Sequence, residues 1–196
     1  MEKINNAYLV NVSELMKLDI TGKIVVFPTD TVYGVGCKVD DIEAIHKIYE
    51  IKERDYSKPL ALLTPTNDIS CYTSNVSNEA EELMKKYWPG ALTVIVNKNK
   101  KINDLVTSGL DTVGFRMPNS KVALQILNHF GVMATTSINI SGQPPLNDVN
   151  DIIKEFSDKI DYIVIDKENT SNVSSTVVDC TKEGIKVLRQ GSIIIK

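Results

Sequence analysis

Three basic side chains stand close together in the segment KERDYSKPL, residues 52–60. Lys52, Arg54 and Lys58 follow an expected helix at the point where the chain leaves it, and Pro59 stiffens that exit. A fork of Arg and Lys side chains can bind phosphate oxygens through charge-assisted hydrogen bonds. Basic residues at the end of a helix are also favoured by the helix dipole, so a purely structural role stays open from this segment alone.

Hydroxyl, amide and glycine residues accompany apolar runs at two places in the chain. PTDTVYGVGCK, residues 28–38, follows the run KIVVF, and ATTSINISGQP, residues 134–144, continues another apolar run. A third short polar segment, SST at 174–176, opens a later expected strand. Turns rich in Ser and Asn often make only local hydrogen bonds, but three such segments favour one shared polar site. Their hydroxyl and backbone N–H groups suit a polar small molecule that carries a phosphate.

Two further arginines, Arg116 and Arg189, stand at the ends of apolar runs. A lone charge at such a position either faces solvent or pairs with an anion. Together with the three cations of 52–60, they place positive charge beside the polar, glycine-bearing segments of a chain whose net charge is -3. This arrangement predicts an anionic ligand.

Several common kinds of site are not indicated. The phosphate-binding pattern GxxxxGK[ST] is absent, and the segment from Gly34 has Val39 where the third glycine of a dinucleotide fingerprint belongs. His46 and His129 are far apart, so neither a histidine-rich metal site nor a Ser-His-Asp triad is expected. The three cysteines form no disulfide framework, and no apolar run approaches a membrane span. We therefore expect a cytoplasmic protein without a membrane segment.

The order of the expected elements indicates an α/β (α+β) fold with a mixed sheet in one domain, residues 1–196. The net charge gives no overall attraction to nucleic acid or to anionic membranes. Runs of β-branched residues predict strands, and apolar residues at spacings of three and four predict helices. The expected strands are 24–27, 92–96, 113–117, 132–135, 162–165, 176–179 and 185–188. The first expected helix is capped by Asp40 or Asp41 and continues to Ile51. The second covers 78–87, the third begins at Asn119, and the fourth covers 149–156.

Six motifs, taken in chain order, resemble the YrdC-like threonylcarbamoyl-AMP synthase family. They are PTDTVYGVGC, KER with the trailing SKPL, WPGALT, GLDTVGFRMP, TSINISGQPP, and SSTVVDC followed by LRQG. The motif-bearing core extends from about residue 24 to residue 191. The resemblance implies a single YrdC-like domain in which a twisted mixed sheet, flanked by helices, surrounds a large electropositive cavity.

The resemblance also implies an activity. Family members convert L-threonine, bicarbonate and ATP into threonylcarbamoyl-AMP, pyrophosphate and water, which is the first step in forming threonylcarbamoyladenosine at position 37 of tRNA. Mg²⁺ accompanies the ATP, and no protein side chain is assigned to the metal. The implied partners are tRNA or double-stranded RNA and a downstream threonylcarbamoyl transferase complex.

The family motifs imply a role for each matching residue. Lys52 and Arg54 are expected to be catalytic, because they would stabilise the phosphate oxygens in the transition state. Neither a nucleophilic side chain nor a histidine base is required, since positioning and electrostatics can supply the acceleration. The residues expected to bind threonine are Thr31, Arg116, Ser137 and Ser175, and those expected to bind the nucleotide are Lys52, Arg54, Lys58, Thr112, Asn139, Asn147 and Arg189.

The chain departs from the family pattern at two places. Many relatives have a His shortly after the KxR signature, where this chain has Leu63 in PLALLT, so that threonine contact is expected to be absent or supplied differently. Some relatives add a second C-terminal domain, whereas this sequence ends shortly after Gly191, so no gating by such a domain is expected.

Two alternative functions are weaker. A non-catalytic module that binds double-stranded RNA or tRNA is disfavoured by the acidic balance and by the shortage of aromatic motifs. A carbamoyl-transfer domain that uses carbamoyl phosphate normally lies in a much longer chain with zinc-finger-like cysteines, which are absent here.

Overall fold

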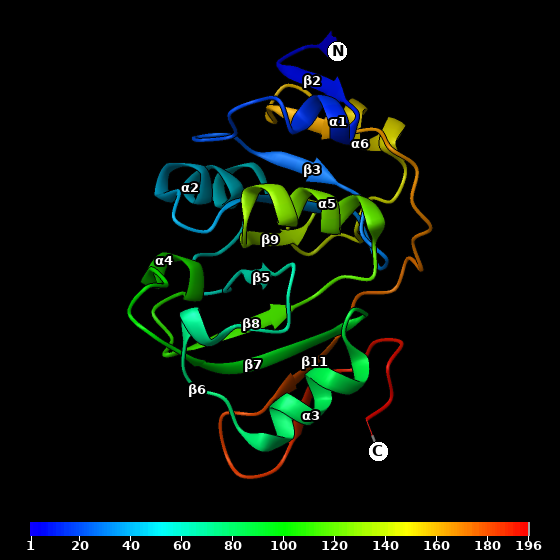
Figure 1. The fold of residues 1–196 in the computed structure, drawn as a ribbon. Coiled ribbons are helices and arrows are strands. Elements are labelled where there is room, and N and C mark those ends of the chain that lie inside the picture. Colours follow the sequence, from blue (N-terminus) through cyan, green and yellow to red (C-terminus); the bar gives the residue numbers. More distant parts are fainter. Residues whose placement is uncertain (196) are drawn as a thin grey trace.

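A mixed β-sheet of twelve strands runs through the molecule in this computed structural model, which describes residues 1–195. The strands are β1 (Glu2–Ile4), β2 (Ala7–Val10), β3 (Val25–Phe27), β4 (Gly34–Lys38), β5 (Ala61–Leu63), β6 (Thr73–Asn75), β7 (Leu92–Lys98), β8 (Thr112–Arg116), β9 (Met133–Ser137), β10 (Tyr162–Val164), β11 (Thr176–Asp179) and β12 (Lys186–Arg189). Their order is β1-β2-β10-β3-β4-β9-β5-β8-β7-β11-β12, and β6 pairs with β7 (Figure 1).

Parallel and antiparallel pairs alternate irregularly across this sheet. Strand β10 lies parallel to β2 and β3, β5 to β8, and β11 to β7, whereas β4 is antiparallel to both β3 and β9. The N-terminal strands β1 and β2 lie at one end of the sheet, and β11 and β12 lie at the other. The polar segments after β3, in β9 and before β11 come from distant parts of the chain.

Within residues 1–195, six α-helices and one short 3-10 helix surround the sheet. They are α1 (Val12–Leu15), α2 (Ile42–Ile51), α3 (Asn78–Tyr87), α4 (Asp104–Thr107), α5 (Lys121–Phe130), α6 (Val149–Phe156) and η1 (Ser70–Tyr72). Side chains of Asp41, Ser77, Ser120 and Asp148 accept hydrogen bonds from the first turns of α2, α3, α5 and α6. These caps satisfy backbone N–H groups that have no partner within a helix, and so they set where each helix begins.

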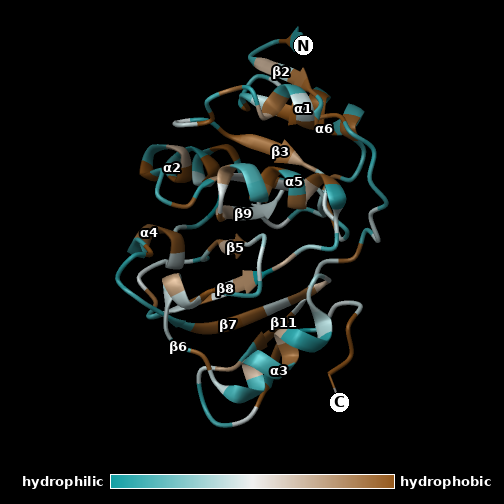
Figure 2. Ribbon diagram, viewed as in Figure 1, coloured by the Kyte–Doolittle hydropathy of each residue, from teal (hydrophilic) through white to brown (hydrophobic). Residues whose placement is uncertain are grey.

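The two faces of the sheet bury different apolar clusters, because successive residues of a strand point to opposite sides. Val25 and Phe27 pack with α1 and α5, whereas Ile24 and Val26 belong to the larger cluster with α2, α3 and α6. Figure 2 shows β3, β5, β7 and β8 mainly in apolar colours, whereas α3 shows both polar and apolar ones. Helices α1 and α5 cover the part of this face that lies between β2 and β5 in the order of the sheet. The rest of the face, near β8, β7 and β11, is left for a cavity.

The sequence predictions for the regular elements agree well with the structure. The strand 176–179 and the helices 78–87 and 149–156 have the predicted bounds, and the other predicted strands differ by one or two residues at an end. The predicted start of α5 at Asn119 is wrong, because Ser120 caps the helix and the helix begins at Lys121. Strands β1, β2, β4, β5 and β6 and the short helices α1 and α4 were not predicted.

Candidate functional site

The uncovered part of the sheet face holds a cavity of about 330 Å³. Its walls come from β5, β7, β8, β9 and β11, from the loop between β3 and β4, and from the segment before β11. The volume lies in the range of about 300–1,000 Å³ that is typical of small-molecule sites. Seven of the eleven residues predicted to form the site line this one cavity: Thr31, Arg54, Thr112, Arg116, Ser137, Ser175 and Arg189.

Three arginines and several hydroxyl side chains make the polar part of the lining. Arg54, Arg116 and Arg189 all face the cavity, and among the described residues that line it none is acidic. Burial lowers the pKa of all three guanidinium groups, but an arginine stays protonated under ordinary conditions. The lining therefore suits an anionic ligand.

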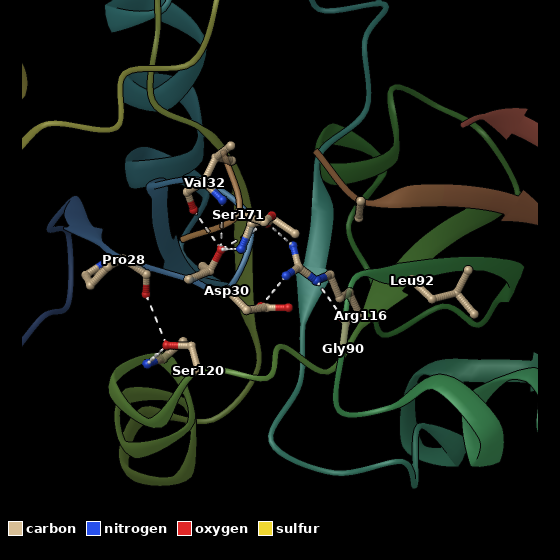
Figure 3. Close-up of polar contacts among 12 residues, drawn as sticks. Pro28, Asp30, Val32, Gly90, Leu92, Arg116, Ser120 and Ser171 are labelled. Atoms are coloured by element: carbon tan, nitrogen blue, oxygen red, sulfur yellow. Dashed lines mark hydrogen bonds and ion pairs between the residues drawn. The ribbon is translucent and has the colours of Figure 1, made fainter. Parts of the chain in front are cut away.

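Arg116 is held in a fixed orientation at the end of β8. Its Nε donates to the carbonyl oxygen of Gly90 at 3.0 Å, its Nη1 donates to Thr31 Oγ1 at 2.6 Å, and its Nη2 forms an ion pair with Asp30 (Figure 3). A guanidinium has five N–H bonds, and these contacts use three of them. One N–H remains on each terminal nitrogen, and these two donors are left for an anionic group such as a carboxylate.

The loop Thr29–Tyr33 prearranges the hydroxyl that meets Arg116. Thr29 Oγ1 donates to the carbonyl oxygen of Val32 at 2.7 Å, so the 3.1 Å contact between the two hydroxyls makes Thr31 the donor to Thr29. Thr31 thus donates to Thr29 and accepts from Arg116, and its residue is fully buried. This geometry makes Thr31 a residue that orients Arg116.

Ser175 is connected to two neighbouring elements. Its hydroxyl lies 2.8 Å from Thr93 Oγ1 of β7 and accepts from Arg189 Nη2 at 3.1 Å, and its carbonyl oxygen accepts from Arg189 Nε at 3.0 Å. Arg189 thereby ties β12 to the segment before β11 while three of its N–H bonds remain for a ligand. Thr93 also lines the cavity, although the sequence did not single it out.

Arg54 lies at the cavity rim in the loop that follows α2. Its Nε donates to the carbonyl oxygen of Lys58 at 3.1 Å and its Nη2 donates to that of Pro59 at 2.9 Å. The hydroxyl of Tyr49 also donates to the Lys58 carbonyl, at 3.0 Å, so the loop is anchored on α2. Three N–H bonds of Arg54 remain for an anion.

Lys52 does not reach the cavity and lies behind its wall. The residue is 1% exposed, and its ammonium donates to the carbonyl oxygens of Ser137 and Asn139 and to Asn139 Oδ1. Burial, with a smaller contribution from Arg54, lowers the pKa of Lys52 to about 7. In this arrangement Lys52 acts on the site through Ser137, which lines the cavity, and Asn139, whose Oδ1 accepts from the Ser137 hydroxyl at 2.7 Å.

The other predicted nucleotide-binding residues, Lys58, Asn139 and Asn147, are not among the residues that line the cavity. Lys58 is exposed, and its Nζ is 3.5 Å from Ser141 Oγ. Asn139 donates from Nδ2 to the carbonyl oxygens of Ile140 and Gln143 at 2.8 Å, and is thus used to shape its own loop. The Oδ1 of Asn147 is buried and has no hydrogen-bond partner among residues 1–195. A buried acceptor without a donor is costly, so Asn147 is the member of this group whose side chain most needs a ligand.

The two glycines of strand β4 are explained by its neighbour β9. Gly34 and Gly36 chiefly make room for the side chain of Thr135. A Cβ at Gly34 would lie 3.0 Å from Thr135 Cγ2, and one at Gly36 would lie 2.9 Å from Thr135 Oγ1. The glycines thus allow Thr135 to extend across β4, and Thr135 itself lines the cavity.

Protein side chains do not fit a resident metal ion here. Among residues 1–195 no group of three or more His, Cys, Asp or Glu residues is placed to hold one. The acidic residue in contact with the site, Asp30, is paired with Arg116. Within the same residues no helix has both the length and the apolar character needed to cross a membrane.

Fold and site together define a class of protein: an α/β domain whose mixed sheet, covered by helices on one face and partly on the other, leaves an arginine-lined cavity. A family model for Sua5/YciO/YrdC, described as telomere recombination, matches residues 20–191. The chain belongs to the Sua5/YciO/YrdC family.

Proteins with related sequences include threonylcarbamoyl-AMP synthases. The enzyme of Pyrococcus abyssi is 36% identical over 174 residues, which are 88% of this chain and 51% of that protein. The enzyme of Bacillus subtilis is 35% identical over 87% of this chain and 50% of its own length. The chain thus spans about half the length of these two relatives. A putative threonylcarbamoyl-AMP synthase of Methanocaldococcus jannaschii is 32% identical over 99% of this chain and 92% of that protein.

Solved structures agree with this relationship. Sua5 of P. abyssi complexed with L-threonine has a TM-score of 0.88 at 33% sequence identity and covers 97% of this chain and 58% of its own. YciO of E. coli has a TM-score of 0.85 at 24% identity, with 96% and 97% covered, and shows the same fold. The predicted mixed-sheet architecture is therefore confirmed.

Proposed function

We propose that this chain is an L-threonylcarbamoyladenylate synthase, which converts L-threonine, bicarbonate and ATP into threonylcarbamoyl-AMP, pyrophosphate and water. The main support is that Arg116, with two unused N–H bonds, and Arg54, with three, face one cavity. Such a cavity can hold the carboxylate of an amino acid near the phosphates of a nucleotide. The names of the relatives and the threonine complex of P. abyssi Sua5 support the same reaction.

In this proposal the amino-acid end of the cavity is built around Arg116. Its remaining fork binds the threonine carboxylate, and Thr31 keeps the guanidinium in place. Ser137 and Ser175 line the same cavity and offer hydroxyls to the polar groups of threonine. Leu63, where many relatives have His, adds an apolar wall to the cavity, so the threonine hydroxyl is bound by the serines.

The nucleotide end is built around Arg54, Thr112 and Arg189, with Lys58, Asn139 and Asn147 as its outer part. Threonine and bicarbonate first give a carbamate and water, and a carbamate oxygen then attacks the α-phosphorus as pyrophosphate leaves. Negative charge on the phosphate oxygens shifts during that attack, so Arg54 stabilises the transition state more than the ground state. Lys52 contributes by fixing Ser137 of the amino-acid end and Asn139 of the outer nucleotide end.

The metal and partners follow from this reaction. We propose that Mg²⁺ enters with ATP and is held by the phosphates, because no cluster of side chains among residues 1–195 would bind it. A mixed carbamic-phosphoric anhydride hydrolyses readily, so the product needs a downstream threonylcarbamoyl transferase complex that acts on tRNA. The proposed reaction also suits a cytoplasmic location, where tRNA is available.

One experiment tests the proposal directly. The purified chain is incubated with L-threonine, bicarbonate and Mg-ATP, pyrophosphate is assayed, and threonylcarbamoyl-AMP is sought by mass spectrometry. We expect pyrophosphate only when all three substrates are present. Pyrophosphate release that does not depend on threonine, or none at all, would contradict the proposal, and salt-sensitive RNA binding without turnover would indicate the RNA-binding module instead.

A further inference from the structure

The ion pair between Asp30 and Arg116 lies at the amino-acid end of the cavity. The Asp30 and Arg116 side chains are only 16% and 8% exposed, so both charges are largely removed from water (Figure 3). The two side chains come from different parts of the sheet, the loop after β3 and the end of β8. A carboxylate and a guanidinium are therefore held side by side next to a cavity that Arg116 lines.

The Asp30 carboxylate uses only one of its oxygens in this contact. Oδ1 accepts from Arg116 Nη2, and no residue between 1 and 195 donates a hydrogen bond to Oδ2. The backbone around it is fixed, because Ser171 N–H donates to the Asp30 carbonyl oxygen at 3.0 Å and Thr29 holds both Thr31 N–H and Val32 N–H. Asp30 thus presents a preset acceptor with unused hydrogen-bonding capacity.

An α-amino acid has the complementary pair of charges. Its carboxylate and its ammonium are separated by one carbon atom, so a fork of N–H donors and a neighbouring carboxylate can bind both groups at once. Arg116 has one N–H left on each terminal nitrogen. Its ion-pair partner, Asp30, has one unused oxygen, Oδ2. Burial of the pair strengthens both contacts, because little water competes for them.

We propose that Asp30 binds the α-ammonium group of the amino-acid substrate and thereby makes the site select α-amino acids over other small carboxylates. This inference rests on the proposed function, because it assumes that the amino acid binds at Arg116. On carbamoylation the ammonium releases one proton to solvent and loses a second hydrogen in the water formed from bicarbonate, and the same Asp30 oxygen can then accept the remaining N–H of the carbamate. Asp30 therefore serves both the substrate and the intermediate.

The test compares two ligands that differ only in the amino group. L-Threonine and (R)-3-hydroxybutyrate, which lacks that group, are titrated by calorimetry into the wild-type chain, Asp30→Asn and a control, Asp104→Asn. The control removes the ion pair between Lys98 and Asp104, neither of which lines the cavity. Loss of one charge-assisted contact predicts that Asp30→Asn binds threonine on the order of 10- to 100-fold more weakly. Its affinity for 3-hydroxybutyrate should change by less than about threefold, which is within the range of a neutral contact.

The outcomes separate the possible roles of Asp30. An equal loss for both ligands would overturn the inference and show that Asp30 only positions Arg116, and an unchanged threonine affinity would overturn it as well. Retained ATP binding and an unchanged melting temperature identify a folded variant. If Asp30→Asn is not folded, Asp30→Glu takes its place, and the ratio of its affinities for threonine and 3-hydroxybutyrate is compared with that of the wild type. A wild-type chain that binds threonine but releases no pyrophosphate would contradict the proposed function and leave this binding test valid.

Discussion

The Lys52 ammonium donates to both oxygens of Asn139, at 2.7 Å to the carbonyl and at 2.9 Å to Oδ1. A third contact, to the carbonyl oxygen of Ser137, completes the three donors of the ammonium. No carboxylate among residues 1–195 forms an ion pair with Lys52, so its charge is balanced only by these dipoles. A buried charge of this kind should be visible in the pH dependence of stability.

Replacing Lys52 by Met should change that pH dependence. The pKa of Lys52 is about 7 in the folded chain and 10.5 as an ordinary value, so between these pH values the unfolded chain binds a proton that the folded chain lacks. Stability of the wild type should therefore rise with pH in this window, by at most about 1.4 kcal/mol per pH unit from this group. Urea unfolding at pH 6, 8 and 10 measures the slope, and Lys52→Met should lack this part of it. Parallel curves for the two chains would show that the three acceptors keep Lys52 protonated throughout.

Arg54→Ala should reduce adenylate formation on the order of 100-fold or more, because it removes N–H donors that line the cavity and that the proposed reaction assigns to the phosphates. Its contacts to Lys58 and Pro59 lie in an exposed loop, so the melting temperature should fall only slightly. Arg54→Lys is the matched control, since it keeps the charge and loses the planar fork. Threonine-dependent pyrophosphate release measures the effect, and wild-type turnover in Arg54→Ala would exclude Arg54 from the site.

Much of the site could be predicted because its motifs contain the residues that line the cavity. Arg54, Arg116 and Arg189 were recognised from their types and from their positions at the ends of regular elements. The orientation of Lys52 could not be predicted, because the carbonyl oxygens that bind it belong to β9 and the loop that follows it, far along the chain. Strand β4 was also missed, since a Gly-x-Gly segment has low intrinsic preference for a strand and pairs with β3 and β9 for tertiary reasons.

Asp30 and Thr93 were missed for a different reason. Both lie inside recognised motifs, PTDTVYGVGC and WPGALT, but their roles depend on contacts with Arg116 and Ser175 across the sheet. The carboxylate of Asp30, within a hydroxyl-rich segment, could have indicated its role. An acidic side chain at a site for anions requires a cationic partner, which predicts an ion pair with one of the arginines. Thr93 gave no such signal, since an alternating strand position favours Thr for its shape alone.

Substitutions at Arg116 should separate binding from stability. Arg116→Lys keeps a charge next to Asp30 but loses the fork, so the KM for threonine should rise at least about tenfold while the KM for ATP stays within twofold. Arg116→Met leaves Asp30 buried without its partner and should lower the free energy of unfolding by about 3 kcal/mol. The double variant Arg116→Met with Asp30→Asn should recover part of that loss. An unchanged KM for threonine in Arg116→Lys would contradict the carboxylate-binding role.

Thr93→Val should weaken threonine binding through Ser175. The valine has nearly the shape of threonine but cannot hydrogen-bond the Ser175 hydroxyl, which lies 2.8 Å from Thr93 Oγ1. Loss of one neutral hydrogen bond predicts a KM for threonine about 3- to 10-fold higher. Thr93→Ser retains the hydroxyl and should behave like the wild type. A KM raised by Thr93→Ser but not by Thr93→Val would contradict the prediction, because the methyl group that valine keeps would then matter and the hydroxyl would not.

Alanine at Gly34 and alanine at Gly36 should each destabilise the fold, but Thr135→Ser should relieve only the first. Gly34→Ala would bring a Cβ to 3.0 Å from Thr135 Cγ2, whereas Gly36→Ala would bring one to 2.9 Å from Thr135 Oγ1 and 3.0 Å from the Ala134 carbonyl oxygen. Each should lower the free energy of unfolding by about 1–3 kcal/mol, as overpacking does. Thr135→Ser deletes Cγ2, so it should restore Gly34→Ala, but it keeps the hydroxyl and the backbone oxygen that oppose Gly36→Ala. Urea unfolding of the two single and two double variants measures this, and equal rescue of both glycine variants would contradict the contacts described for Thr135.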